Sequence, residues 1–444
     1  MESIWSSTVS IEHRTPLDGD KRTEAVIIGA GMSGVLTAYR LAKKGVSCIV
    51  LESDRIGSGQ TRNTTAKITS QHGMKYDYLI RNFGVDMARQ YAHANETAIR
   101  DYAHLIKDLK ISCDFRNCPA YLYSCSRDAV LKAEALAAQQ AGIPAEFTTE
   151  TSLPFSVQGA LRFPDQAQFH PLKFLKAVSS ELEIYEKTRV LSAEEGKIQT
   201  DRGTVTADHV IFACHYPFLN IPGYYFSRMH QDRSYVISLS GAEQLDGMYY
   251  GIEPGSLSFR NYKDQLLVGG AGHRTGNNYE GGRYESLKEQ ALYYWKDSTE
   301  TARWSAQDCM TLDKIPYIGR FSCKRPNWYV ATGFEKWGMT SSMVSARLLT
   351  DLITGQENPD SAVFSPQRRI TGTAVQEFIK DGLHAAAGLG KGILPTSGKK
   401  VCTHMGCRLE WNPDEEMLEC PCHGSRFTKD GALVNGPAKR DLTL

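Results

Sequence analysis

The stretch Ala25-Val-Ile-Ile-Gly29-Ala-Gly31-Met-Ser-Gly34 and the residues after it, up to Leu41, decide the fold of this chain. Its first four residues are apolar and mostly β-branched, which predicts a buried parallel strand. Gly29 permits a tight turn, Gly31 lets a pyrophosphate approach the backbone, and Gly34 lets the following helix pack closely on the strand. Phosphates would lie at the helix N-terminus, where free N–H groups and the dipole favour negative charge.

The residues that follow make a nucleotide site the favoured interpretation over a glycine turn without a ligand. A second strand over residues 47–51 ends at Glu52, which is placed to bind a ribose hydroxyl. Residues 55–67 then form a loop rich in Gly and Thr. Such a loop is well suited to crossing a cofactor with its backbone, although an ordinary surface loop remains the alternative.

Composition excludes several classes of function. The 444 residues predict two or three domains, and 51 Lys and Arg against 50 Asp and Glu give no electrostatic case for nucleic acid or an anionic membrane. No apolar run is long enough for a transmembrane helix, and charges in the first twenty residues exclude a signal peptide. Seven scattered cysteines predict reduced thiols and a cytoplasmic location, whereas four crowd into residues 402–422.

Hydrophobic periodicity predicts how the chain is divided. Helices are expected over 85–110, 129–141, 171–182 and 340–353, and a short amphipathic helix over 374–383. Short strands over 235–239, 248–250, 257–260 and 266–268 predict an antiparallel sheet. We therefore expect a lead-in (1–23), a discontinuous nucleotide-binding domain (24–75, 165–225 and 305–356), an inserted second domain (76–164 and 226–304), a linker (357–389) and a tail domain (390–444).

The tail carries the most specific pattern in the sequence. Cys402-Thr-His404 is followed, after fifteen residues, by Cys420-Pro-Cys422-His423. Two thiolates and two imidazoles suit tetrahedral zinc, or a Rieske [2Fe–2S] centre with two Cys on one iron and two His on the other. Cys407 follows the first ligand pair and Cys422 lies within the second, in places where a disulfide could join the two loops. This extra pair favours the Rieske centre, with zinc as the alternative.

With both motifs established, the chain resembles a known architecture. Residues 22–355 resemble the D-amino-acid oxidase superfamily of FAD enzymes, on the branch close to γ-glutamylputrescine oxidase, and residues from about 385 to 444 resemble a Rieske domain. The resemblance implies an α/β FAD-binding Rossmann-like domain with an inserted α+β substrate domain, plus a small all-β Rieske domain. The implied cofactors are FAD and a [2Fe–2S] cluster.

The resemblance also assigns residues to the two cofactors. The positions that match the FAD-binding pattern are Gly29, Gly31, Gly34, Glu52, Ser58, Thr61, Thr64, Thr65, Ala66, Val190, Ala213, Gly319, Gly333, Trp337, Gly338 and Met339. The implied cluster ligands are Cys402, His404, Cys420 and His423, with a disulfide between Cys407 and Cys422. The two histidines are expected to lie exposed at the tip of the cluster.

The sequence departs from the family pattern in two places, the base of the Rieske domain and the neighbourhood of Cys309. Few residues precede Cys402, so the base of the Rieske domain is expected to be shortened. Some relatives attach FAD covalently through a cysteine before the last strand, but the spacing of Cys309 does not fit. A buried core cysteine is the better interpretation.

The resemblance implies oxidation of an amine or amino-acid-like C–N bond by hydride transfer to flavin. The candidates that face the flavin are Lys336, Trp337 and Arg260, where Lys336 would stabilise reduced flavin and Arg260 would anchor a substrate carboxylate. His273 and Arg274 are weaker candidates, and His72 and His170 are expected to cap or pack.

The cluster would pass electrons singly to an external acceptor, a protein or a quinone. Two alternatives remain at this stage. One is a reductase in which a partner drives electrons through the cluster to the flavin. The other is a redox sensor or electron-transfer module without enzymatic activity.

Overall fold

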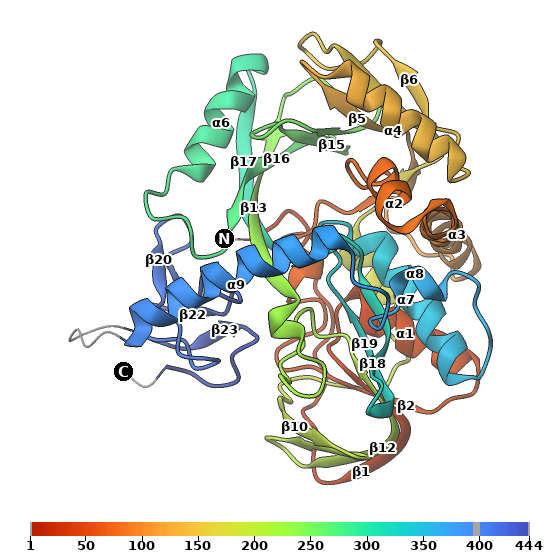
Figure 1. Ribbon diagram of the computed structural model, residues 1–444, viewed down its shortest axis with the longest axis vertical. Helices are drawn as coiled ribbons and strands as arrows, with labels where there is room; N and C mark the ends of the chain where they lie inside the picture. Colours follow the sequence, from red (N-terminus) through yellow and green to blue (C-terminus); the bar gives the residue numbers. More distant parts are fainter. Residues whose placement is uncertain (1, 394–399, 443–444) are drawn as a thin grey trace.

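A computed structural model describes residues 2–393 and 400–442, with the side chains of residues 383–393 left out of the description. Its first layer is an eight-stranded sheet in the order β10-β11-β12-β1-β2-β9, with β19 beside β12 and β18 beside β19 (Figure 1). The strands are β1 (Lys21–Ile28), β2 (Cys48–Leu51), β9 (Ile184–Tyr185), β10 (Val190–Glu194), β11 (Lys197–Thr200), β12 (Thr204–Phe212), β18 (Tyr317–Ser322) and β19 (Arg325–Thr332).

The centre of this sheet is parallel, as the apolar run after Glu24 predicts. β1 pairs in parallel with β2 and with β12, and β12 pairs in parallel with β19. Two helices, α1 (Met32–Lys43) and α7 (Gly338–Ile353), pack against each other on the sheet, and α3 (Val85–Asp108) packs on α7. The N-termini of α1 and α7 therefore both lie beside the ends of the parallel strands.

A second eight-stranded sheet has the order β17-β13-β16-β15-β14-β5-β7-β6. It confirms the expected antiparallel sheet, although β14 and β5 pair in parallel. Its strands are β5 (Ala120–Ser124), β6 (Glu146–Thr148), β7 (Gly159–Phe163), β13 (Met229–Ser240), β14 (Met248–Gly251), β15 (Ser258–Tyr262), β16 (Gln265–Arg274) and β17 (Thr299–Thr311). β17 is continuous through residues 304 and 305, where the sequence predicted a domain boundary.

The smaller elements surround these two sheets. Helices α2 (Tyr76–Phe83), α4 (Asp128–Gln140) and α6 (Arg283–Tyr294) pack on or beside the second sheet, and α5 (Pro171–Val178) packs near α1. A three-stranded sheet joins β3 (Lys67–Ile68), β8 (Ala167–Gln168) and β4 (Arg116–Asn117). Short 3-10 turns lie at η1 (Gln60–Asn63) and η2 (Tyr225–Ser227).

Two helices differ in length from the prediction. α5 ends at Val178 rather than near residue 182, because the hydroxyls of Ser179 and Ser180 bond back to main-chain carbonyls. The predicted short helix is instead α9 (Gly372–Ile393), 22 residues long, preceded by α8 (Ser361–Phe364). No proline interrupts residues 372–393, and several alanines follow residue 384, so the helix continues beyond its amphipathic part.

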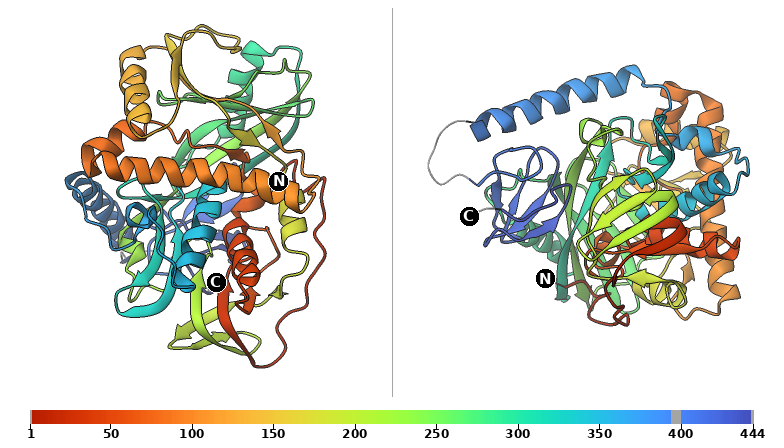
Figure 2. Two further views of the ribbon diagram at one scale, coloured as in Figure 1. Left: turned by 90° about the vertical axis from the view of Figure 1, so that its right-hand side faces the viewer. Right: turned by 90° about the horizontal axis from the view of Figure 1, so that it is seen from below.

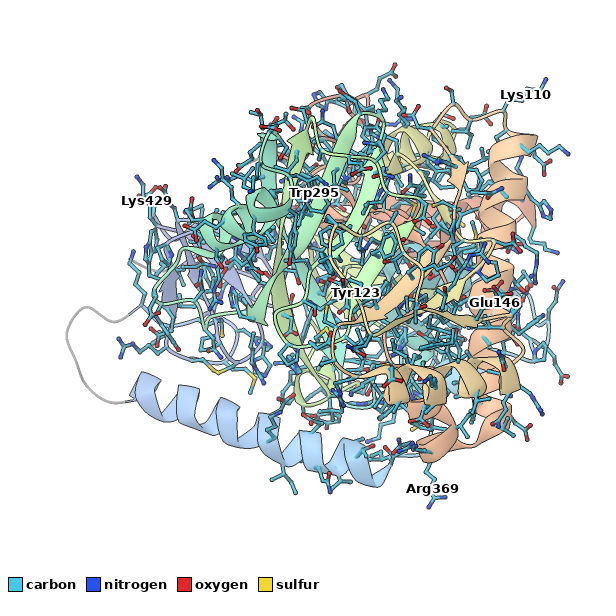
Figure 3. The ribbon with its side chains drawn as sticks, turned by 90° about the horizontal axis from the view of Figure 1, so that it is seen from above. Lys110, Tyr123, Glu146, Trp295, Arg369 and Lys429 are labelled. Carbon is cyan, nitrogen blue, oxygen red and sulfur yellow. A yellow bond between two sulfur atoms is a disulfide. The ribbon has the colours of Figure 1, made fainter. Side chains whose placement is uncertain are left out.

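The C-terminal module is a small four-stranded antiparallel sheet of β20 (Glu410–Asn412), β21 (Met417–Glu419), β22 (Arg426–Thr428) and β23 (Leu433–Asn435). It packs beside β13 and β17, and α9 runs along the molecule toward it (Figures 1 and 2). Viewed from above, Arg369 lies just before α9, and Lys429 lies in the C-terminal module, on the side turned away from the helix (Figure 3). Among the residues that the structure describes, no helix has the length and apolar character needed to cross a membrane.

Candidate functional site

The first turn after β1 leaves open space beside Gly31. Gly29 has φ +109°, and a Cβ there would lie 2.6 Å from the carbonyl oxygen of Ala213. A Cβ on Gly34 would lie 1.9 Å from the oxygen of Gly29, so helix and strand are in close contact. A Cβ on Gly31 would meet only the Thr61 hydroxyl, at 3.3 Å. The N-terminus of α1 is therefore accessible to a phosphate group at Gly31.

The Glu52 side chain is hydrogen-bonded to the backbone of this turn. Its carboxylate accepts hydrogen bonds from the backbone N–H of Ala30 (2.8 Å) and of Asp54 (2.8 Å). Burial raises the pKa of Glu52, while these two N–H groups act in the opposite direction. Its contact with a ribose stays a prediction.

A cavity of about 940 Å³ opens between the two large sheets. The predicted residues that line it are Thr61, Thr64, Thr65, Ala213, Lys336, Trp337, Gly338 and Met339. The other predicted flavin residues do not line it: Gly29, Gly31, Gly34, Glu52, Ser58, Ala66, Val190, Gly319 and Gly333. The structure thus brings the Thr-rich loop and the start of α7 together around one space, which is large enough for a dinucleotide and a small substrate.

Arg260 does not lie in this cavity. Its side chain is 1% exposed, and Nη1 donates to the carbonyl oxygens of Thr65 (2.6 Å) and Ala66 (2.9 Å). Burial lowers the pKa of Arg260 to about 10. Because the guanidinium holds the backbone of the Thr-rich loop, the predicted role as a substrate anchor is corrected to a structural one.

Lys336 and Trp337 do line the cavity. Lys336 Nζ donates to the Ser234 hydroxyl (2.7 Å) and lies 3.9 Å from a carboxylate oxygen of Asp308. The Trp337 ring stacks on His72, with centroids 4.9 Å apart. These two side chains can face a bound flavin from the beginning of α7.

The two histidines that were expected to cap or pack do so. His72 is buried and bonds through its two ring nitrogens to the Tyr91 hydroxyl (2.6 Å) and the Thr69 carbonyl (2.6 Å). Burial lowers the pKa of His72 well below its usual value. His170 caps α5 by accepting from the backbone N–H of Lys173.

Of the remaining candidates, His273 and Arg274 lie outside the cavity, whereas Cys309 borders it. His273 bonds to the Tyr235 hydroxyl (3.0 Å) and to the carbonyl of Arg274 (2.8 Å). Cys309 is 2% exposed on β17, and its thiol donates to the carbonyl of His215. This position agrees with a buried core cysteine.

Strands β13 and β17 separate the cavity from the C-terminal module, and sequence reasoning missed this wall. Asp232, Ser234, Ala306 and Asp308 line the cavity. The residues that alternate with them, Gln231, Arg233 and Gln307, contact the C-terminal module instead. Side chains alternate in this way because successive residues of a strand point to opposite faces. The available signal was the run of polar residues over 230–234. A strand without an apolar face is expected where polar groups lie on both of its sides.

The four predicted cluster ligands converge in the C-terminal module. Cys402 and Cys420 are both buried, and their thiols interact directly. The rings of His404 and His423 lie 4.9 Å apart at 87°. Nδ1 of each ring is buried without a hydrogen-bond partner among the described residues. A pair of thiols in contact and a pair of imidazoles with unpartnered nitrogens are the donor types that a cluster with a Cys pair and a His pair requires.

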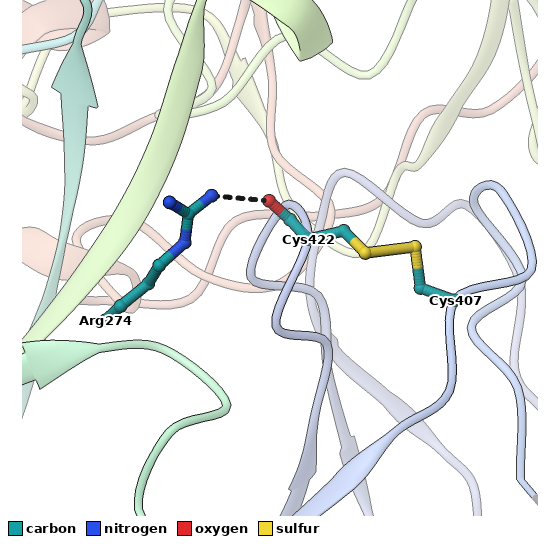
Figure 4. The surroundings of a disulfide bond; sticks show 3 residues. All are labelled: Arg274, Cys407 and Cys422. Carbon is teal, nitrogen blue, oxygen red and sulfur yellow. Dashed lines mark hydrogen bonds between the residues drawn. A yellow bond between two sulfur atoms is a disulfide. The ribbon is translucent and has the colours of Figure 1, made fainter. Parts of the chain in front are cut away.

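A disulfide joins the two ligand loops. Cys407 and Cys422 are bonded, and Arg274 donates to the carbonyl oxygen of Cys422 at 3.5 Å (Figure 4). The sulfur of Cys420 lies within 4.8 Å of both disulfide sulfurs. The disulfide therefore packs directly against the ligand pair, and its own sulfurs are not available as ligands.

The prediction that both histidines are exposed is wrong for His423, which is 5% exposed. Gln231 Nε2 donates to its carbonyl oxygen (2.6 Å), and the Phe226 ring lies 6.1 Å away. His404 is partly buried, and its Nε2 donates to Asn220 Oδ1 (2.8 Å). The expectation came from Rieske domains taken alone, whereas here the rest of the chain covers the tip.

Buried charges hold the module in place. Arg233 forms ion pairs with Glu419 (3.0 Å) and Glu415 (3.4 Å), and Arg426 pairs with the same two carboxylates. The side chains of Arg233 and Glu419 are 1% and 0% exposed. Burial alone would raise the pKa of Glu419, but the two arginines lower it. The docking surface is thus a buried network of opposite charges, in which Arg233 Nε, Arg426 Nε and Glu419 Oε1 meet as ion pairs without a hydrogen bond of good geometry within the described part of the chain.

Comparisons with known proteins identify the families of both parts of the chain. Residues 24–352 match the family model of FAD-dependent oxidoreductases of the DAO type, and residues 395–443 match the Rieske [2Fe–2S] domain. A Bacillus subtilis protein, named as the candidate Rieske 2Fe-2S iron-sulfur protein YhfW, is 35% identical, with 99% of this chain and 97% of that protein covered.

Solved structures share the fold of the larger part. Glycine oxidase from Geobacillus kaustophilus superposes with a TM-score of 0.67 at 19% identity, covering 79% of this chain and all of the oxidase. L-amino acid deaminase from Proteus vulgaris gives 0.66 at 16% identity, with 81% of this chain and all of the deaminase covered. The DAO-type part binds FAD and the C-terminal part binds a [2Fe–2S] cluster. The chain belongs to the DAO family of FAD-dependent oxidoreductases and carries a Rieske domain at its C-terminal end.

Proposed function

We propose that this enzyme oxidises an amine or amino-acid-like substrate at a C–N bond and passes the electrons singly through its Rieske cluster to an external acceptor. The observation that carries the proposal is the wall of β13 and β17. Its Asp232 and Asp308 line the flavin cavity, while Gln231 and Gln307 bond to the loop that carries His423. One layer of strands, on the order of 10 Å thick, separates the two cofactor sites.

Hydrogen bonds continue from one site to the other. Gln60 lines the cavity, and its side-chain oxygen accepts from the backbone N–H of Gln307 (2.7 Å). Gln307 Nε2 donates to the carbonyl of Gly424 and to Gln231 Oε1, both at 2.7 Å. A short, bonded route of this kind supports electron transfer within the chain, because electronic coupling falls steeply with distance.

The reaction balances with two one-electron acceptors. The substrate C–H bond breaks, its electron pair leaves with the hydrogen to the flavin, and a C=N bond forms. The substrate loses two electrons and two protons in total, and two molecules of acceptor are each reduced by one electron. A protein or a quinone can fill this role.

The residues that line the cavity support an amine as the class of substrate. Asp232 and Asp308 provide carboxylates on its wall, and these favour a substrate with a basic nitrogen. The solved relatives with this fold are named as an oxidase of glycine and a deaminase of L-amino acids. We assign Lys336 the role of placing positive charge beside reduced flavin, with Trp337 as part of the wall that orients the substrate.

We also propose that the protein is located in the cytoplasm. This location is supported by the scattered cysteines, which form no disulfide among the described residues.

The test is to mix the holoenzyme anaerobically with a panel of amines and amino acids, following flavin absorbance and the EPR signal of the reduced cluster. Bleaching of the flavin followed by a Rieske signal is expected. In Cys402→Ser/His404→Ala, substrate should still reduce the flavin, while reduction of a one-electron acceptor should fall at least tenfold. Cys323→Ser, at an exposed cysteine, is the control.

Other outcomes would reject the proposal. Flavin bleaching without a cluster signal, with peroxide formed in air, would indicate a simple oxidase. No response to any amine, but flavin reduction when the cluster is reduced first, would indicate the reversed flow of electrons. Equal loss of flavin reduction and of acceptor reduction in the double variant would show that the flavin and the cluster do not carry out separate steps.

A further inference from the structure

A chain of charged side chains leads from the flavin cavity to α9. Asp232 lines the cavity, and one of its oxygens lies 3.5 Å from His230 Nε2. The other ring nitrogen of His230, Nδ1, is bonded to Asp381 at 2.9 Å. Asp381 lies on α9 and is 14% exposed, and Arg274 pairs with its second oxygen at 2.5 Å. One histidine thus bridges a carboxylate inside the cavity and a carboxylate at the surface.

The proposed electron route creates a need for such a chain. With both cofactors bound, hydride transfer would bring one proton into the cavity together with two electrons, and a [2Fe–2S] cluster would serve as a carrier of single electrons. The proton must therefore leave the cavity by another way. The wall that faces the cluster offers mainly amide and guanidinium groups at Gln231, Gln307 and Arg233, which are poor proton carriers.

We propose that Asp232, His230 and Asp381 form a proton exit that releases the flavin proton at α9 while the electrons leave through the cluster. This inference rests on the proposed function. Asp232 receives the proton inside the cavity. His230, which carries a proton on each ring nitrogen at rest, gives its Nδ1 proton to Asp381, which passes it to solvent. The neutral ring then turns over, so that its bare nitrogen faces Asp232 and takes the proton held there, which restores the starting state. No atoms are lost or gained, because one proton enters at the cavity and one leaves at the surface.

The charges around His230 suit this role. Burial alone would lower its pKa, but hydrogen bonds to Asp232 and Asp381 raise the pKa of His230 to about 9, against the opposing charge of Arg274. Lys336 lines the cavity, as Asp232 does, and its positive charge helps to lower the pKa of the Asp232 carboxylate. Glu335 is a further acidic group near His230, and the charge of His230 acts to lower the pKa of Glu335. Near neutral pH, His230 is therefore protonated between two carboxylates, ready to pass a proton outward.

The test uses His230→Gln and Asp381→Asn in the holoenzyme, with His93→Gln as the matched control. His93 also pairs with a carboxylate, Asp360 at 2.8 Å, but does not line the cavity. We expect flavin reduction by substrate to stay within twofold of wild type in all three. In the two relay variants, cluster reduction and proton release to a pH indicator should slow at least tenfold, with a larger solvent deuterium isotope effect. Added imidazole should restore much of the rate in His230→Gln.

A second measurement does not depend on turnover. An NMR titration of ring-labelled histidine in the oxidised holoenzyme should give His230 a pKa near 9, and Asp381→Asn should bring it down by at least one unit. The relay is overturned if both variants release protons and reduce the cluster at wild-type rates, if imidazole restores nothing, or if the pKa of His230 does not change. Failure of the wild-type enzyme itself to reduce its cluster would overturn the proposed function instead.

Discussion

The two ligand loops of the cluster have matching patterns of cysteine and histidine but different surroundings. The loop of residues 420–425 lies against β13 and β17, where Gln231, Gln307 and Arg274 bond to three consecutive backbone carbonyls. Within the part of the chain that the structure describes, the loop of residues 402–407 is bonded to the larger domain through the side chains of its histidine and Asn220. The difference teaches that the Cys and His of one loop lie against the strands that wall the cavity, whereas those of the other loop lie nearer the edge, on the side that the proposed external acceptor would approach.

The largest expected effect comes from breaking the buried charges behind the inner loop. Arg233→Met leaves Glu415 and Glu419 with a single arginine, so the free energy of unfolding should fall by about 3–5 kcal/mol. Denaturant titration followed by the visible circular dichroism of the cluster would measure it. Arg81→Met, which breaks a pair whose arginine is 71% exposed, is the control and should cost under about 0.5 kcal/mol. A loss below about 1 kcal/mol in Arg233→Met would mean that the network does not hold the module.

Two equivalent glycines compare the loops directly. Gly424 and Gly406 both have φ +81°, so alanine is strained at either position by about 1–2 kcal/mol. A Cβ on Gly424 would also lie 2.7 Å from Cβ of Gln231, whereas a Cβ on Gly406 would meet nothing within 4 Å. Gly424→Ala should therefore cost about 1–3 kcal/mol more than Gly406→Ala in the same titration. Equal costs would show that the inner loop is not tightly docked.

The smallest effect is expected at the outer loop. Asn220→Ala removes the acceptor of the His404 Nε2–H bond and should lower the free energy of unfolding by about 0.5–1.5 kcal/mol. The EPR signal of the cluster should remain. Loss of the cluster in this variant would mean that the outer loop depends on the rest of the chain as strongly as the inner loop does.

Local patterns in the sequence predicted much of the site. The glycine motif predicted β1, the turn and α1, because strand and helix periods and a tight turn depend on neighbouring residues. The spacing of Cys402, His404, Cys420 and His423 predicted the ligand loops for the same reason. Arg260 shows the limit, since only packing reveals that its guanidinium bonds to backbone carbonyls rather than facing the cavity.

The sequence by itself therefore determined two cofactor-binding modules and the residue types that serve them. Only the tertiary structure decided how the modules meet. The contacts of Gln231 with His423 and of His230 with Asp381 join residues 192 and 151 positions apart. No local pattern encodes such contacts, because they arise when separate elements bury polar groups against each other. Those contacts cover His423, place one sheet layer between the cavity and the predicted cluster loops, and connect the cavity to α9.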